Sequence, residues 1–160
     1  MKIAYPFRVW EGDDSYIVQG LPPLDNVLTY GKTVADALAS AREALTGVLG
    51  AMLDRGQPIP DHPGVDDGEG IYLVEPFAKV TAPILLRKAR EAAGLTQGEL
   101  AGRLQVSYQA IQKLERSGAN PTVSTLERVF RGLGWGLELE LGQAAFHDPV
   151  EPMRNQRNHL

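Results

Sequence analysis

Hydroxyl, amide and cationic side chains are concentrated between residues 107 and 116. The set comprises Ser107, Tyr108, Gln109, Gln112, Lys113 and Arg116. Ile111 and Leu114 are three residues apart, so a helix through this segment turns both inward and leaves most of the polar set on the opposite face. Such a face can form hydrogen bonds with nucleic-acid bases, since Gln pairs with adenine and Lys donates to guanine.

Local signals predict two short helices, one on each side of Gln105 and Val106. Thr96 is followed three residues later by Glu99, the spacing of a capping box, and Ser107 is a suitable N-cap for the second helix. Two short helices joined by a tight turn have the geometry of a helix-turn-helix, whose second helix enters the DNA major groove. An ordinary helical hairpin with a solvated face would show the same pattern.

The surrounding sequence resembles the helix-turn-helix of the Cro/CI (XRE-like) repressor family over about fifty residues, from Leu86 to Gly134. The features that carry the resemblance are Leu95-Thr96-Gln97, Ser107-x-x-Ala110-Ile111-x-x-Leu114-Glu115 and Asn120-Pro121-Thr122-x-x-Thr125-Leu126. One departure is Gln105, where the family often has Gly. Because a positive φ at Gln costs free energy, we expect a strained or differently closed turn.

The resemblance implies which side chains meet DNA. The residues that it places at base edges are Ser107, Tyr108, Gln109, Gln112 and Lys113. Those that it assigns to phosphates are Gln97 and, as weaker candidates, Arg103, Arg116 and Asn120. Packing of Tyr108 against the neighbouring helix is an alternative, and a plain surface role is an alternative for each weaker phosphate candidate.

An enzymatic site is not favoured. The carboxylates that could serve a metal-dependent hydrolase are Asp13, Asp14, Asp25, Asp36 and Glu43. Each has a structural explanation, such as the place of Asp36 in a first helical turn, where it complements the helix dipole. The spacing of the histidines, His62, His147 and His159, matches no metal motif. We therefore expect no catalysis, metal or cofactor.

Composition and charge indicate a two-part globular protein. The chain has 160 residues and no cysteine, which excludes disulfides and thiolate chemistry. Residues 1–80 contain 6 Lys/Arg and 12 Asp/Glu, a net charge of −6, whereas residues 81–134 contain 8 and 4, a net charge of +4. This division suggests two different partners. Since the sequence shows neither a membrane span nor a signal pattern, we expect a cytoplasmic protein.

The acidic half predicts a small β-β-β-α-β module. Strand-like runs cover residues 3–10, 15–19 and 27–30, and a fourth at residues 71–75 returns to the sheet. Apolar residues at three- and four-residue steps predict one long helix, capped by Thr33 and ending near Gly56. The fold class expected for the whole chain is α+β, with an all-α helix-turn-helix domain and a C-terminal strand after the module.

This half resembles the N-terminal domain of HicB antitoxins, a partial RNase H-like fold, over about residues 3–75. The features that carry the resemblance are Tyr30-Gly31-x-Thr33-x-x-x-Ala37-Leu38, the long helix and Gly56-x-Pro58-Ile59-Pro60. Followed by a Cro/CI-type domain, the module is similar to a HicB subtype. That resemblance implies a type II antitoxin: residues 1–78 would bind and occlude HicA, a small basic ribonuclease, and residues 79–142 would bind the operator and repress the operon. The alternative is a stand-alone transcriptional regulator whose N-terminal domain senses a small ligand.

The end of the helix-turn-helix domain points to self-association. Leu137, Leu139 and Leu141 alternate with polar residues, which predicts a strand with one apolar face. An isolated strand leaves its edges unsatisfied, so we expect it either to pair with its symmetry mate in a dimer or higher oligomer, or else to cap the helical domain. A dimer would place two recognition helices about 34 Å apart, in successive major grooves. Residues 143–160 are expected to be disordered.

Overall fold

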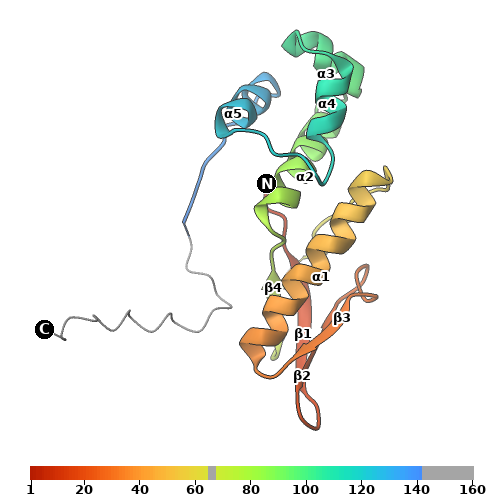
Figure 1. Cartoon of the computed structure of the whole chain (residues 1–160), viewed down its shortest axis with the longest axis vertical. Coiled ribbons are helices and arrows are strands. Elements are labelled where there is room, and N and C mark those ends of the chain that lie inside the picture. The colour runs from red at the N-terminus through yellow and green to blue at the C-terminus, as the bar shows by residue number, and fades with distance from the viewer. Residues whose placement is uncertain (65–67, 142–160) are drawn as a thin grey trace, which may run out of the picture.

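The computed structural model describes residues 1–64 and 68–141, and it confirms a mixed α+β chain. An antiparallel sheet and one long helix form the N-terminal half, and four shorter helices follow (Figure 1). The elements, in chain order, are β1 (Tyr5–Glu11), β2 (Tyr16–Gly20), β3 (Leu28–Gly31), α1 (Val34–Asp54), β4 (Ile71–Val74), α2 (Ala78–Ala92), α3 (Gln97–Leu104), α4 (Tyr108–Leu114) and α5 (Val123–Gly132).

The sheet has the spatial order β3-β2-β1-β4, and every pairing is antiparallel. The first three strands form an antiparallel meander, and β4 returns after α1 to pair with β1, as predicted. In this register Val9 lies opposite Val18, and Phe7 lies opposite Tyr72. The predicted strand and helix ends agree with the structure to within about two residues, the ordinary uncertainty of such boundaries.

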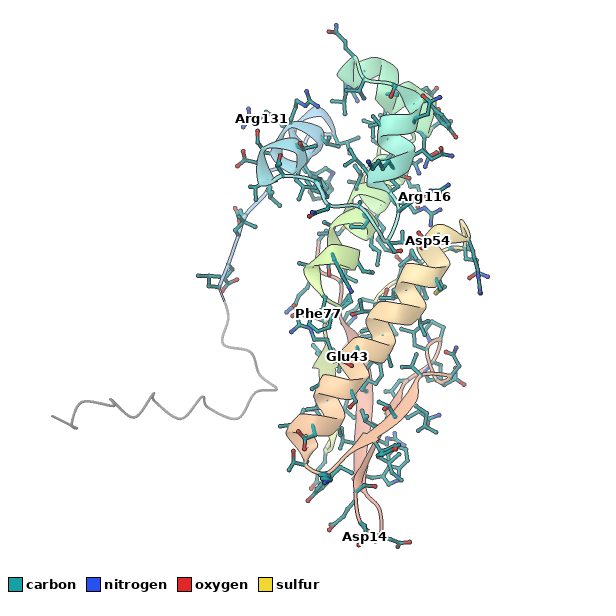
Figure 2. The ribbon with its side chains drawn as sticks, in the orientation of Figure 1. Asp14, Glu43, Asp54, Phe77, Arg116 and Arg131 are labelled. Atoms are coloured by element: carbon teal, nitrogen blue, oxygen red, sulfur yellow. The ribbon has the colours of Figure 1, made fainter. Side chains whose placement is uncertain are left out.

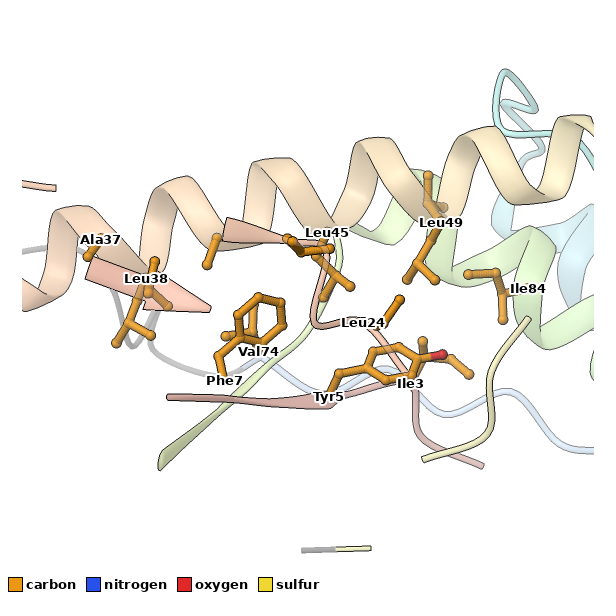
Figure 3. Close-up of a cluster of buried hydrophobic side chains, with 14 of the residues drawn as sticks. Ile3, Tyr5, Phe7, Leu24, Ala37, Leu38, Leu45, Leu49, Val74 and Ile84 are labelled. Carbon is orange, nitrogen blue, oxygen red and sulfur yellow. The ribbon is translucent and has the colours of Figure 1, made fainter. Parts of the chain in front are cut away.

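A first hydrophobic core lies between α1 and one face of the sheet (Figure 3). Phe7 and Val74 on the strands meet Leu45 and Leu49 on the helix, and all four side chains are fully buried. Alternation along each strand explains why every second side chain is buried, because residues two apart point to the same face of the sheet. Close approach at the start of α1 requires Gly31, since a Cβ there would overlap the backbone of the helix.

Helix α2 belongs to two cores. Val80 and Ile84 pack in the first core, whereas Leu86 and Ala89 pack in a second core with α3, α4 and α5. The predicted domain boundary at residue 78 therefore coincides with the start of a helix that both halves use. The division of the chain into two domains at residue 78 stays a prediction.

A hydrogen-bonded joint adds to the connection between the halves. The carboxylate of Asp54, the last residue of α1, accepts hydrogen bonds from the Ser117 amide at 3.0 Å and the Ser117 hydroxyl at 2.6 Å. Ser117 lies in the loop between α4 and α5. These two hydrogen bonds hold the pKa of the Asp54 carboxyl below its ordinary value. The end of the long helix is thus fixed against the helix-turn-helix.

The predicted C-terminal strand is not present in the single chain. Residues 135–141 have no regular secondary structure, and Leu137 packs partly on the second core while Leu139 and Leu141 are exposed. The physical reason is that a strand requires a hydrogen-bonded neighbour, which this segment lacks within one copy. Pairing with a second copy stays a prediction. The tail predicted to be disordered, residues 143–160, lies outside the described residues.

Candidate nucleic-acid interface

Local hydrogen bonds fix the start of α3, the first helix of the helix-turn-helix. Thr96 and Glu99 form the predicted capping box: the Glu99 amide donates to the Thr96 hydroxyl at 3.2 Å, and the Thr96 amide donates to the Glu99 carboxylate at 2.8 Å. Hydrogen bonds from the backbone and hydroxyl of Thr96 lower the pKa of the Glu99 carboxyl. After α3 the chain reverses at Gln105, which adopts left-handed geometry with φ 54° and ψ 44°. The strained turn expected from the sequence is confirmed.

Helix α4 is positioned by its buried side. Ile111 is fully buried in the second core, and Leu114 packs partly against it. The Ser107 hydroxyl accepts the Ala110 amide at 3.1 Å and so caps the helix as predicted. These contacts fix the rotation of α4 about its axis, and therefore which side chains it presents.

The residues predicted to meet base edges lie on the exposed side of α4. Ser107, Gln109 and Lys113 are exposed and Gln112 is half-buried. Tyr108 is 47% exposed, so its ring is a surface group and not a core residue. The structure thus brings the five candidates onto one short helix and its cap. The contacts of these five side chains with bases stay a prediction.

A buried ion pair fixes α4 against α2. Nε and Nη2 of Arg90 donate to the two carboxylate oxygens of Glu115, at 2.6 and 2.8 Å, and Nη1 donates to the Leu95 carbonyl at 2.7 Å. Only 9% of Arg90 and 4% of Glu115 is exposed. The hydrogen bonds to Glu115 raise the pKa of Arg90 above its ordinary value, so the guanidinium stays charged. Paired bidentate geometry of this kind is directional as well as strong.

Gln97 joins this pair, which the sequence did not predict. Its Nε2 donates to Glu115 at 2.9 Å, so part of the amide is already used inside the protein. Contact of Gln97 with a DNA phosphate stays a prediction. The hydrogen bond to Glu115 holds the Gln97 side chain in place. The other phosphate candidates, Arg103, Arg116 and Asn120, are exposed. Figure 2 shows Arg116 near Asp54, at the end of α1.

Two exposed cations on the neighbouring helix α5 were not singled out from the sequence. Arg128 and Arg131 are exposed on α5, three residues apart and therefore on neighbouring turns of one helix. Arg128 also lines a hollow of about 360 Å³ between α4 and α5, together with Lys113 and Asn120. Their three-residue spacing was the signal in the sequence that could have identified Arg128 and Arg131 as cations on one side of a helix. For Arg90 and Glu115, which come from segments 25 residues apart, no local signal existed.

The carboxylates considered for catalysis do not form a metal site in the described residues. Across residues 1–64 and 68–141, no group of three or more His, Asp or Glu side chains could hold a metal ion. Asp36 lies in the first turn of α1, where its backbone amide donates to the capping Thr33 hydroxyl at 3.1 Å. Within the same described residues, no helix is both long enough and apolar enough to span a bilayer.

Comparisons with known proteins agree with this geometry. A family model described as "Helix-turn-helix" matches residues 86–138. An uncharacterized HTH-type transcriptional regulator of Methanothermobacter thermautotrophicus is 42% identical over 50 residues, which are 31% of this chain and 72% of the relative. Antitoxin HicB 2 of Photorhabdus laumondii is 27% identical over 138 residues, which are 86% of this chain and 96% of the relative.

The chain belongs to the helix-turn-helix family, and α2 to α5 are its XRE-type domain. The antiparallel sheet and α1 precede that domain, and the similarity to antitoxin HicB 2 extends into both halves, since it covers 86% of this chain. A crystal structure of the Burkholderia pseudomallei antitoxin HicB matches 68% of this chain and 89% of its own, at 16% identity. The TM-score of 0.42 is too low for an element-by-element comparison.

Proposed function

We propose that this chain is the antitoxin of a type II HicAB pair. Its N-terminal module, residues 1–78, would bind and neutralise an mRNA-cleaving toxin of the HicA type. Its helix-turn-helix, within residues 79–142, would bind operator DNA and repress its own operon. The observation that carries the proposal is that one helix, α2, packs into both cores, so that the sheet-and-helix module and the helix-turn-helix form one continuous structure.

The distribution of charge supports two different partners. The module of residues 1–80 carries a net charge of −6, which suits a basic ribonuclease that normally binds RNA phosphates. The helix-turn-helix, at +4 over residues 81–134, suits DNA. We assign no catalysis to this chain, since the proposed ribonuclease is the partner. An mRNA-cleaving partner and operator DNA are both cytoplasmic ligands, so we propose that the protein acts in the cytoplasm.

Operator binding requires a second copy in this proposal. A charge of +4 supports few phosphate contacts, and a dimer doubles them. Residues 137–141, with Leu139 and Leu141 exposed, would pair across the two-fold axis and space two α4 helices by about 34 Å. Deletion of residues 136–142 should lower the oligomeric state in light scattering. An unchanged oligomer would show that another surface joins the copies.

Growth rescue is the test of the antitoxin assignment. Expression of the toxin encoded beside this chain should arrest growth, and co-expression of the full chain should restore it. The double variant Gln109→Ala/Lys113→Ala should still rescue growth but should lose repression of an operon reporter, because it changes only the exposed side of α4. Absence of rescue by the wild-type chain, or of any neighbouring gene for a small basic protein, would favour the ligand-sensing regulator instead.

A further inference from the structure

The sheet has a second face, opposite α1, that we call the outer sheet face. It is formed by the strand residues that alternate with those of the first core. On β1 to β3 these residues include Arg8, Trp10, Ile17, Gln19, Leu28 and Tyr30, and β4 adds Ile71 and Leu73 beside Arg8 and Pro6. In the part of the chain that the structure describes, α1 is the helix that covers the sheet, and it lies on the side to which Phe7 and Val74 point (Figure 3). The outer sheet face therefore looks away from the helix.

Apolar and aromatic groups dominate this face, although it is open to solvent. Trp10 lies opposite Ile17, and Ile17 lies opposite Tyr30, so the three form one row across three strands. Tyr30 is 71% exposed, Leu28 59% and Trp10 39%. An antiparallel sheet with one solvated face ordinarily places polar residues there. A contiguous exposed apolar surface with Trp, Tyr and Arg has the composition of a protein-binding site.

Acidic groups border the row. Glu11 follows Trp10 directly, and Asp13 and Asp14 form the β1–β2 turn, where Figure 2 shows Asp14 at the end of the molecule farthest from the helix-turn-helix. Asp25 precedes β3 near the other end of the strands. The whole module carries −6, so two copies of it repel each other, whereas a basic protein is attracted. Charge thus selects a basic partner over a second copy.

We infer that the outer sheet face is the docking surface for a small basic protein, with Trp10 and Tyr30 as its apolar anchors and the acidic turn as its electrostatic guide. This inference rests on the proposed function, in which that protein is the toxin. Arg8, two residues before Trp10 on β1 and opposite Ile71 of β4, adds a cation with several donors that can form hydrogen bonds with a carboxylate or carbonyl of the partner. The opposite face is not available in this way, because α1 covers it.

The test measures binding of the full chain to a ribonuclease-inactive form of the adjacent toxin, by calorimetry. Trp10→Ala and Tyr30→Ala should each weaken binding by about 10- to 30-fold, as expected for anchors of an interface. Tyr72→Ala is the matched control. Tyr72 is on the same sheet and is 39% exposed, but it lies opposite the inward-pointing Phe7, so its removal should change the affinity less than about twofold. Thermal unfolding of each variant establishes that it is folded, and Tyr30, the most exposed of the three, is the variant least able to disturb the core.

The contribution of the acidic turn, Asp13 and Asp14, is measured by the rate of association. Asp13→Lys/Asp14→Lys should slow association several-fold at low salt and leave dissociation nearly unchanged, since charges at a rim act mainly on the encounter rate. Glu127→Lys on α5, far along the chain in the other domain, should not alter the association rate.

The possible results separate the two proposals. If the wild-type chain does not bind the toxin, the proposed function and this inference both fail. If the wild-type chain binds and the Trp10 and Tyr30 variants bind equally well, only the docking surface is wrong. If these variants instead lower the oligomeric state in sedimentation while toxin binding is kept, the face joins two copies of this chain, and the inference is again overturned.

Discussion

The Arg90 guanidinium and the Glu115 carboxylate form a bidentate ion pair, with hydrogen bonds of 2.6 and 2.8 Å, inside the helix-turn-helix core. The pair joins α2 to the residue that follows α4, and Gln97 at the start of α3 donates to the same carboxylate. Three helices are thereby oriented around one carboxylate. The orientation of the DNA-reading helix depends on a contact that does not face DNA.

Removal of one partner of this ion pair should lower the free energy of unfolding substantially. Glu115→Ala leaves the Arg90 charge buried and without its partner, and we expect a loss of about 3 to 5 kcal/mol in the free energy of unfolding. Urea denaturation measures it. Glu91→Ala is the control, because Glu91 is an exposed neighbour 4.0 Å from Arg90 and should contribute less than about 1 kcal/mol. Equal effects of the two changes would show that the buried pair has no special role.

The left-handed Gln105 predicts a stabilising substitution. Gln105→Gly should raise the free energy of unfolding by about 1 kcal/mol, since glycine adopts φ 54° without a Cβ clash. Gln105→Val should lower it, because a β-branched residue is least compatible with this geometry. The urea midpoint should shift while the m value stays constant.

A matched control distinguishes turn geometry from a general effect of glycine. Gln112→Gly, inside α4, should destabilise by about 1 kcal/mol, the usual cost of glycine in a helix. Stabilisation by glycine at both positions would contradict the assignment of strain to Gln105.

The exposed side of α4 and the cations around it should differ in their effects on DNA binding. Gln109→Ala should reduce discrimination at one base position by about 1 to 3 kcal/mol. Arg103→Ala should weaken binding to all sequences alike and reduce the slope of log affinity against log salt by about 1. Fluorescence anisotropy with operator and scrambled duplexes at several salt concentrations separates the two. A uniform loss from Gln109→Ala would argue that α4 does not read bases.

Tyr5 predicts a loss of stability at alkaline pH. Burial, with a smaller contribution from Asp61, raises the pKa of Tyr5 to about 12 from 10.0. Because the folded state holds the proton more tightly, the stabilisation is complete below pH 10 and is lost as the pH rises from 10 to about 12, by roughly 2 to 3 kcal/mol in total. Urea denaturation across this range measures it.

Two phenylalanine variants test that origin. Tyr5→Phe loses the hydrogen bond to the Pro60 carbonyl but should show a weaker alkaline decline, since it has no phenol to ionise. Tyr30→Phe, on an exposed residue, should decline as the wild type does. The same decline in all three proteins would place its cause elsewhere.

The joint between Asp54 and Ser117 predicts local coupling of the two halves. Asp54→Ala should abolish protection of the Ser117 amide in hydrogen exchange, whereas Ser117→Ala keeps that amide bond and should retain most of the protection. The depressed pKa of Asp54 means that its stabilising contribution is present above about pH 3.8, the ordinary value, and is lost as the pH falls through the folded value. Persistent protection in Asp54→Ala would show that the joint is held by other contacts.

Local signals in the sequence were sufficient to predict the four strands of the sheet, the long helix α1 and the two short helices α3 and α4. The spacing of Thr96 and Glu99 predicted the capping box, apolar periodicity predicted α1, and alternation predicted the strands, because each depends on residues a few positions apart. The departure at Gln105 likewise predicted strained geometry, since φ is a property of one residue. The order of these elements was enough to indicate the two halves.

Only the tertiary structure decided what lies between distant segments. It showed that α2 serves two cores, that Arg90 meets Glu115, and that Gln97 is held by the same carboxylate. It also showed that residues 137–141 form no strand in one copy, although their alternation is regular. A side-chain pattern specifies which face a segment would bury. The backbone partner that makes the segment a strand comes from another part of the fold. The same is true of the opposite charge that a buried arginine requires.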